Sequence, residues 1–164
     1  MRELTVKDRD VFLEFNEKIL DCLQNKEWFI PFSKEEYDQV LTPEHDFFYG
    51  IFDGDKLVAV SGLLLDKSFS KELCDVLGVD VDTTAEVGGS MVLPEYRGQN
   101  LMYNINVKVV EKAREMGFKR LVATVHPDNV ASRTSAEKLG FVKKAVIQRQ
   151  GKYLSNVYLM DLLK

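Results

Sequence analysis

Residues 92–101 constrain the fold most, because they lie between an apolar run typical of a strand and a long helical pattern. Proline cannot donate a hydrogen bond to a sheet ladder, so Pro94 is expected to end the strand. Gly98 lets the backbone turn tightly and approach a ligand closely. The first amides of the following helix have no intrahelical acceptors, and together with the helix dipole they favour an anion such as a diphosphate. The segment therefore predicts either a phosphate-binding loop or an ordinary turn from strand to helix.

The same loop resembles the signature of the GNAT superfamily of acyl-CoA-dependent N-acyltransferases, which is Arg or Gln, two residues, Gly, one residue, then Gly or Ala. Arg97 fills the first position, and Asn100 and Met102 stand at the two later small-residue positions. Asparagine adopts the left-handed backbone conformation more readily than most residues, so Asn100 is expected to keep the turn. For Met102 two interpretations stay open. Its side chain either shifts the coenzyme's pantetheine arm or packs under the sheet.

A second motif at residues 129–141 resembles the same family, with an Asn, an Ala-Ser pair and a final Glu-Lys-Leu-Gly-Phe. Its chemistry predicts a helix between two strands, because Asp128 or Asn129 can cap the start and Gly140 supplies a left-handed stop. The two motifs occur in the family's order and spacing. The resemblance covers most of the chain and is strongest at residues 85–141.

The resemblance implies a single N-acetyltransferase domain over residues 1–164. The implied fold is a mixed, mostly antiparallel α/β sheet of about seven strands, with helices on both faces and with splayed fourth and fifth strands. A length of 164 residues and a hydrophobic content of 45% fit one domain with one sizeable core. Residues 66–83 are long for a loop and resemble an insertion ahead of the fourth strand, with a short helix at 71–77.

Hydrophobic spacing and turn signals predict the other elements. Helices are expected at residues 8–24, 33–41, 101–116 and 129–139, and strands at 3–6, 45–52, 56–65, 85–93, 120–126, 141–149 and 153–162. An Asp-Gly turn at residues 53–55 predicts a hairpin. Gly88 and Gly89 weaken the fourth strand in its middle and predict a bulge or a closely approaching backbone.

The resemblance also implies which residues bind acetyl-CoA as co-substrate. The exposed amides of the splayed fourth strand would hydrogen-bond the pantetheine arm and polarise the thioester carbonyl, and the loop after it would bind the pyrophosphate. Asn129 resembles the family's residue near the arm, a role that is compatible with helix capping. The expected set is Met91, Val92, Leu93, Arg97, Gly98, Gln99, Asn100, Leu101, Met102, Asn129 and Ser132.

Acyl transfer to an amine needs a neutral amine, a polarised carbonyl and a thiolate that can leave. A lysine-like amine of pKa about 10.4 requires about 4.6 kcal/mol to be neutral at pH 7, so a base helps most with such acceptors. Glu86 is either that general base, directly or through a water, or a solvent-facing strand carboxylate. His126 is a second possible base or a structural histidine. The tyrosine that protonates the thiolate in many relatives is Ala136 here, and Tyr153, Tyr158 or a water would have to replace it.

Several side chains have two interpretations each. The aromatic residues near position 30 either line a substrate cleft or belong to the core, and the basic residues of the C-terminal third either meet the coenzyme's ribose phosphate or are solvated. The acidic residues at 35–44 either favour a cationic amine as acceptor or are ordinary partners of a helix dipole. The side chains concerned are Trp28, Phe29 and Phe32, then Arg133, Lys143 and Lys144, and finally Glu35, Glu36, Asp38 and Glu44.

Composition bounds the partners and the location. A net charge of −4 argues against a nucleic-acid binder, and no apolar run is long enough to span a bilayer. The N-terminal residues lack a signal-peptide core, so a cytoplasmic protein is expected. Cys22 and Cys74 are expected to be buried thiols, without a disulfide or a metal site. The expected partner is a small-molecule or peptide amine, and the family resemblance also admits a second copy in a homodimer.

Two other functions stay open. Asn100, Met102 and Ala136 depart from the family's pattern, which motivates an acyl-CoA-binding or sensory module with little or no turnover. A domain that interacts with other molecules and does not bind coenzyme A is a more remote alternative.

Overall fold

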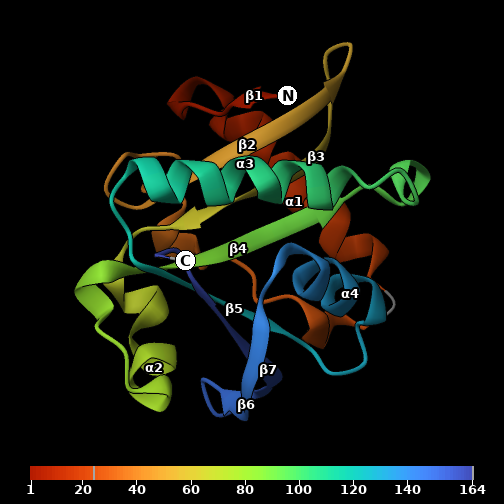
Figure 1. Cartoon of the computed structure of the whole chain (residues 1–164). Coiled ribbons are helices and arrows are strands. Elements are labelled where there is room, and N and C mark those ends of the chain that lie inside the picture. The colour runs from red at the N-terminus through yellow and green to blue at the C-terminus, as the bar shows by residue number, and fades with distance from the viewer. Residues whose placement is uncertain (24, 164) are drawn as a thin grey trace.

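The computed structural model describes residues 1–23 and 25–163, and its centre is a seven-stranded sheet in the order β1-β2-β3-β4-β5-β7-β6 (Figure 1). The pairing of β4 with β5 is parallel, and the other five pairings are antiparallel. The expected mixed, mostly antiparallel sheet is confirmed. The strands are β1 (Arg2–Glu3), β2 (Asp46–Asp53), β3 (Lys56–Leu64), β4 (Thr84–Val92), β5 (Arg120–Val125), β6 (Val142–Arg149) and β7 (Tyr153–Asp161).

Within the described residues, four α-helices cover the sheet: α1 (Arg9–Cys22), α2 (Lys67–Leu77), α3 (Leu101–Glu115) and α4 (Val130–Leu139). Successive residues of β3 are buried on opposite faces, as strand geometry requires. Ala59 packs in one core cluster with α3, whereas Val58 and Val60 pack in another with α1. Leu73 of α2 packs with Val122 of β5 in a third cluster. Helices therefore lie on both faces, as expected, and none within the described residues is long and apolar enough to cross a membrane.

The strands β4 and β5 pair over three residues and then part. The last matched pair is Glu86 with Val122, after which β4 continues along β3 and β5 continues along β7. The predicted bulge is also present, because the register of β3 with β4 shifts between Val60 and Gly62. Gly89 has φ +64°, and a Cβ there would lie 2.7 Å from the ring of Phe48. Only glycine fits this position without strain.

Local side-chain hydrogen bonds explain two elements that are shorter than expected. The expected strand at 3–6 ends at Glu3, because Thr5 and Asp8 form a capping box around the 3₁₀ turn Val6–Asp8. The expected helix at 33–41 is only the 3₁₀ turn Lys34–Glu36, which has the predicted capping box. Further on, Leu41 has φ +65° and donates its N–H to the carboxylate of Asp46.

The segment at residues 66–83 is mostly helical. Asp66 caps α2 through the N–H of Ser68, and the 3₁₀ turn Val81–Thr83 leads into β4. The helix thus begins earlier than the expected residue 71, and the assignment of 66–83 as an insertion stays a prediction. The observed first helix, α1, ends at Cys22. Its expected end at Gln24 lies outside the described residues.

Candidate functional site

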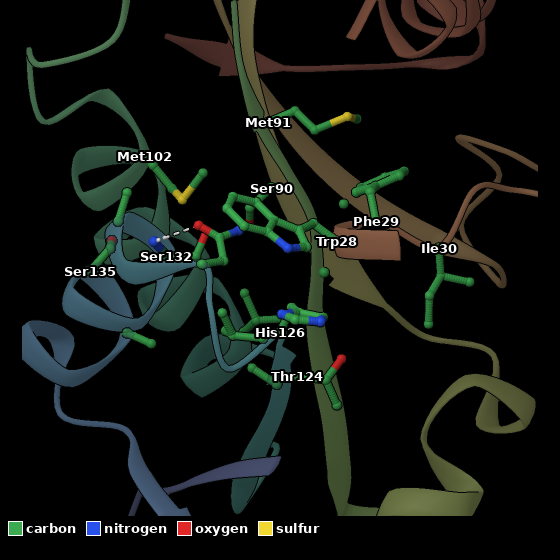
Figure 2. A pocket seen from close by; sticks show the side chains of 18 of the residues that line it. Trp28, Phe29, Ile30, Ser90, Met91, Met102, Thr124, His126, Ser132 and Ser135 are labelled. Atoms are coloured by element: carbon green, nitrogen blue, oxygen red, sulfur yellow. Dashed lines mark hydrogen bonds between the residues drawn. The ribbon is translucent and has the colours of Figure 1, made fainter. Parts of the chain in front are cut away.

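A cavity of about 860 Å³ opens where β4 and β5 part. It is lined by the diverging ends of both strands, the first turns of α3, the inner side of α4 and the segment that follows α1 (Figure 2). Most of the residues expected to contact a coenzyme line it: Met91, Val92, Arg97, Gly98, Asn100, Leu101, Met102, Asn129 and Ser132. The fold therefore brings both sequence motifs to one cavity.

The loop before α3 has the backbone that the sequence predicted. Gly98 has φ +80° and Asn100 has φ +58°, so both are left-handed, and α3 begins at the next residue. The loop is held to the β2–β3 hairpin by two side-chain contacts. The Tyr96 hydroxyl donates to Asp53, and Lys56 Nζ lies 3.2 Å from Glu95 Oε1. The free amides of the first helical turn therefore have a fixed place at one end of the cavity.

Only part of the expected strand amides faces the gap. The N–H of Leu93 donates to the Val58 carbonyl at 2.9 Å, and the Leu93 side chain is in the core. Alternation along an antiparallel pair then directs the amide of Met91 toward β3 as well, and that of Val92 toward the gap. The expectation for the amides of Met91 and Leu93 is therefore wrong, because β3 occupies them. Gln99 is exposed and does not line the cavity.

Met102 points into the cavity, beside Ser132 of α4 (Figure 2). This outcome excludes the interpretation that it packs under the sheet. Asn129 caps α4, since its Oδ1 accepts the N–H of Ser132 at 3.3 Å, and Gly140 ends the helix with φ +113°. Both ends of α4 thus have the predicted caps.

Glu86 is not a solvent-facing carboxylate. It is 3% exposed, and Arg149 donates to both of its oxygens, from Nη2 to Oε1 at 2.6 Å and from Nη1 to Oε2 at 2.9 Å. Arg149 also donates to Thr124 Oγ1 at 3.0 Å and to the Phe69 carbonyl at 2.7 Å. Burial raises the pKa of Glu86, and the charge of Arg149 opposes this shift. Sequence reasoning missed Arg149, because an arginine at the end of a strand is usually solvated.

His126 is 9% exposed and stacks on Trp28, with ring centroids 6.0 Å apart. Its Nδ1 accepts the N–H of Asp128 at 3.1 Å, so the neutral ring carries its proton on Nε2. A nitrogen that already holds a proton cannot accept one from an amine. The geometry therefore argues against His126 as a general base through Nε2.

The two candidate tyrosines have different surroundings. Tyr158 is fully buried, its hydroxyl donates to Glu137 Oε1 at 3.3 Å, and burial raises its pKa. It does not line the cavity, whereas Tyr153 and Ala136 do. Tyr153 thus remains the tyrosine of the two that has access to a reacting group.

Of the other side chains that the sequence singled out, some line the cavity and others do not. Trp28, Phe29 and Phe32 line the cavity, although Phe32 also contacts the core residues Phe12 and Phe48. The exposed Lys143 and Lys144 belong to β6 at the edge of the sheet and do not line the cavity, and neither does Arg133. Lys138, which sequence reasoning missed as a cavity residue, lines it from α4. Cys74 is buried as expected, and Cys22 is exposed, contrary to expectation, because it lies at the open end of α1.

A sheet whose fourth and fifth strands part beside a helix start, with a bulge in the fourth strand, matches the fold that the two sequence motifs implied. The chain matches the family model for the acetyltransferase (GNAT) family over residues 13–141, and it belongs to this family. No sequence among the curated proteins matches the chain.

Solved structures of acetyltransferases have the same fold. The ribosomal-protein-S18-alanine N-acetyltransferase from Escherichia coli is 14% identical, with a TM-score of 0.69 and coverage of 98% of this chain and 92% of that one. A probable acetyltransferase from Staphylococcus epidermidis is 16% identical, with a TM-score of 0.73 and coverage of 98% and 96%. The GNAT domain of S. lividans PAT is 18% identical, with a TM-score of 0.73 and coverage of 98% and 88%.

Proposed function

We propose that the protein is an N-acetyltransferase that transfers an acetyl group from acetyl-CoA directly to an amine in a ternary complex. The observation that carries this proposal is the cavity between β4 and β5, which begins immediately beyond the pair Glu86 and Val122 and extends to the first turn of α3. The acceptor we propose is a small-molecule or peptide amine. Glu27 and Glu36, which line the cavity, suit a cationic one.

In this proposal the coenzyme is held mainly by the backbone. The amides at the start of α3 and the loop at Gly98 bind the pyrophosphate, and Arg97 adds a charged donor at the cavity's rim. The Val92 amide, which is directed toward the gap, hydrogen-bonds the arm or the thioester carbonyl. Asn129 and Ser132 line the other side of the arm.

The chemistry needs no covalent enzyme intermediate. The lone pair of the neutral amine forms the new C–N bond, the C–S bond breaks, and the proton lost by the amine is accepted by Glu86 through a water. Glu86 is suited to this task because Arg149 keeps a carboxylate available in a buried place. A thiol of pKa near 8.5 leaves tolerably as thiolate, and Tyr153 or a water supplies the proton.

A sensory module that binds acyl-CoA with little turnover is the second candidate. Two observations favour it: Ala136 faces the cavity where relatives carry a tyrosine, and Met102 occupies space that a small residue would leave for the arm.

Binding and turnover measured on one sample separate the two candidates. The chain has a single tryptophan, Trp28, and this residue lines the cavity, so its fluorescence reports binding directly. If the protein is an enzyme, it should bind acetyl-CoA, gain thermal stability from this binding and release free CoA thiol with at least one member of a panel of amines. Binding without thiol release on any amine supports the sensor. If acetyl-CoA changes none of the fluorescence, the melting temperature and the calorimetric heat, both the enzyme and the sensor are contradicted.

A further inference from the structure

Three polar side chains are connected under the bulge of β4. Ser61 Oγ lies 2.5 Å from Ser90 Oγ and 2.5 Å from Asn106 Oδ1. The three residues come from β3, β4 and α3, so the contacts join the bulge to the helix that follows the pyrophosphate loop. Ser90 and Asn106 both line the cavity, although Asn106 is only 8% exposed. A polar network in this place has a direct route to a bound ligand.

The protons in this network have one consistent order. The Asn106 Oδ1 carries no proton, so Ser61 donates its proton to it. Ser61 then has no second proton to give, so the Ser90 hydroxyl donates to Ser61. A separation of 2.5 Å is at the short limit of the range for O–H···O and lies below the range for N–H···O, which begins at about 2.7 Å. The side-chain oxygen of Asn106, and not its nitrogen, therefore faces Ser61.

This order leaves the two protons on Asn106 Nδ2 without an acceptor in the network. Within residues 1–23 and 25–163, Asn106 Nδ2 has no hydrogen-bond partner, and it is not among the side-chain atoms that are sealed from solvent without one. Asn106 follows Met102 by four residues, so both lie on the face of α3 that lines the cavity. A nearly buried amide with free protons gains more from a ligand oxygen than a solvated one does, because little water competes.

We propose that Asn106 is a binding residue that donates from Nδ2 to a carbonyl oxygen on the arm of acyl-CoA, with Ser61 and Ser90 fixing its orientation. The inference rests on the proposed function, because it requires the coenzyme arm to lie between β4 and β5. The carbonyl belongs either to the pantetheine amides or to the thioester, and both accept the same hydrogen bond. This side-chain donor from α3 acts in addition to the amide of Val92 on the facing strand.

Calorimetric titration of CoA and acetyl-CoA tests this assignment. The variants are Asn106→Leu, which removes the amide at similar volume, and Asn106→Asp, which replaces the donor by an acceptor. Asn104→Leu and Asn104→Asp are matched controls, because Asn104 is exposed on the same helix. We expect both Asn106 variants to bind acetyl-CoA about two- to tenfold more weakly, as for the loss of one hydrogen bond, and both controls to match the wild type.

The two ligands distinguish the two carbonyls. Free CoA retains the pantetheine amides and lacks the thioester, so an equal loss for both ligands assigns the bond to the pantetheine. A loss confined to acetyl-CoA assigns it to the thioester. Ser61→Ala provides a second measurement if the Asn106 variants fail to fold, and it should weaken the same ligand by a smaller factor. Unchanged affinities in folded Asn106 or Ser61 variants overturn the inference. Failure of the wild type to bind acetyl-CoA overturns the proposed function instead, and the inference with it.

Discussion

The two ends of the cavity are built in different ways. The end at α3 is formed by consecutive residues of one segment, from the last residues of β4 through Gly98 and Asn100 into the helix, and its donors are mostly backbone amides. The end at Glu86 is formed by groups from distant parts of the chain, namely the Phe69 carbonyl and the side chains of Thr124 and Arg149. A site made of contiguous backbone leaves a readable motif, whereas a site assembled from distant side chains does not.

The difference also concerns tolerance to substitution. Backbone amides remain when a side chain changes, so Asn100 and Met102 keep the amides of the loop although they differ from the family's small residues. A buried ion pair tolerates substitution poorly, because removal of one partner leaves the other charge without compensation. Variants at the Glu86 end should therefore have large effects, and variants at the α3 end should have small ones.

The largest effect is expected for Arg149→Met. This change leaves the buried Glu86 without its cation and should lower the free energy of unfolding by about 3–5 kcal/mol. The pKa of Glu86 is raised by burial and should rise further in the variant. Because the pKa of Glu86 is raised in the folded state, folding favours the protonated carboxyl. The stability contributed by this protonation is present at low pH and is lost as pH rises through the folded-state pKa. Urea denaturation from pH 5 to pH 8 should thus show a smaller deficit at pH 5. A deficit that is independent of pH would contradict an ionised Glu86.

Glu86→Gln should lower the rate of acetyl transfer by about a hundredfold, which corresponds to about 2.7 kcal/mol, if Glu86 is the general base. The affinity for CoA should change little, since the proposed coenzyme contacts lie toward the other end of the cavity. The wild-type rate should fall as pH decreases through the raised pKa of Glu86, and this acid limb should disappear in the variant. Glu111→Gln, an exposed change on α3, is the control. An acid limb that persists in Glu86→Gln would assign the base to another group.

Arg97→Gln should weaken CoA binding by a smaller factor, about two- to fivefold, because its exposed charge is screened and the helix amides remain. The loss should shrink as salt increases, which isothermal titration at two ionic strengths can measure. Arg114→Gln, at the far end of the same helix, controls for net charge. An equal loss in both variants would show that Arg97 acts only through the overall field.

The smallest effect is expected for Asn100→Gly. Asn100 already has φ +58°, so glycine should reproduce the turn and change both CoA affinity and stability by less than about 1 kcal/mol. Asn100→Val, which disfavours this conformation, should weaken CoA binding more than the glycine variant does. If the Asn100→Gly and Asn100→Val variants bind CoA equally, the left-handed turn does not shape the site.

The sequence predicted the elements whose signals are local. Gly98, Asn100, Gly140 and the bulge at Gly89 have the expected conformations, because each depends on the backbone preference of its own residue. The mixed, mostly antiparallel sheet and the splay between β4 and β5 followed from the family resemblance, whereas the order of the strands was not predicted.

Contacts between distant residues were not predictable. The helix expected at 33–41 shortens, since the carboxylate of Asp46 accepts the Leu41 amide after the chain has turned. Leu93 donates to Val58 through a register that no local pattern fixes, and the pair of Glu86 and Arg149 joins residues 63 positions apart. In each case the partner that decides the outcome comes from another element.

The short seam between β4 and β5 has a mechanical consequence. Three residue pairs, the hydrogen bond from the Lys119 N–H to the Thr83 carbonyl and the Arg149 guanidinium connect two antiparallel blocks, β1–β4 and β5–β7–β6, whose side chains also share one core cluster. A molecule that binds in the gap between β4 and β5 contacts both blocks and should hold them together. Amide hydrogen exchange of Glu86 and Val122, the last matched pair of β4 and β5, should therefore slow down on ligand binding.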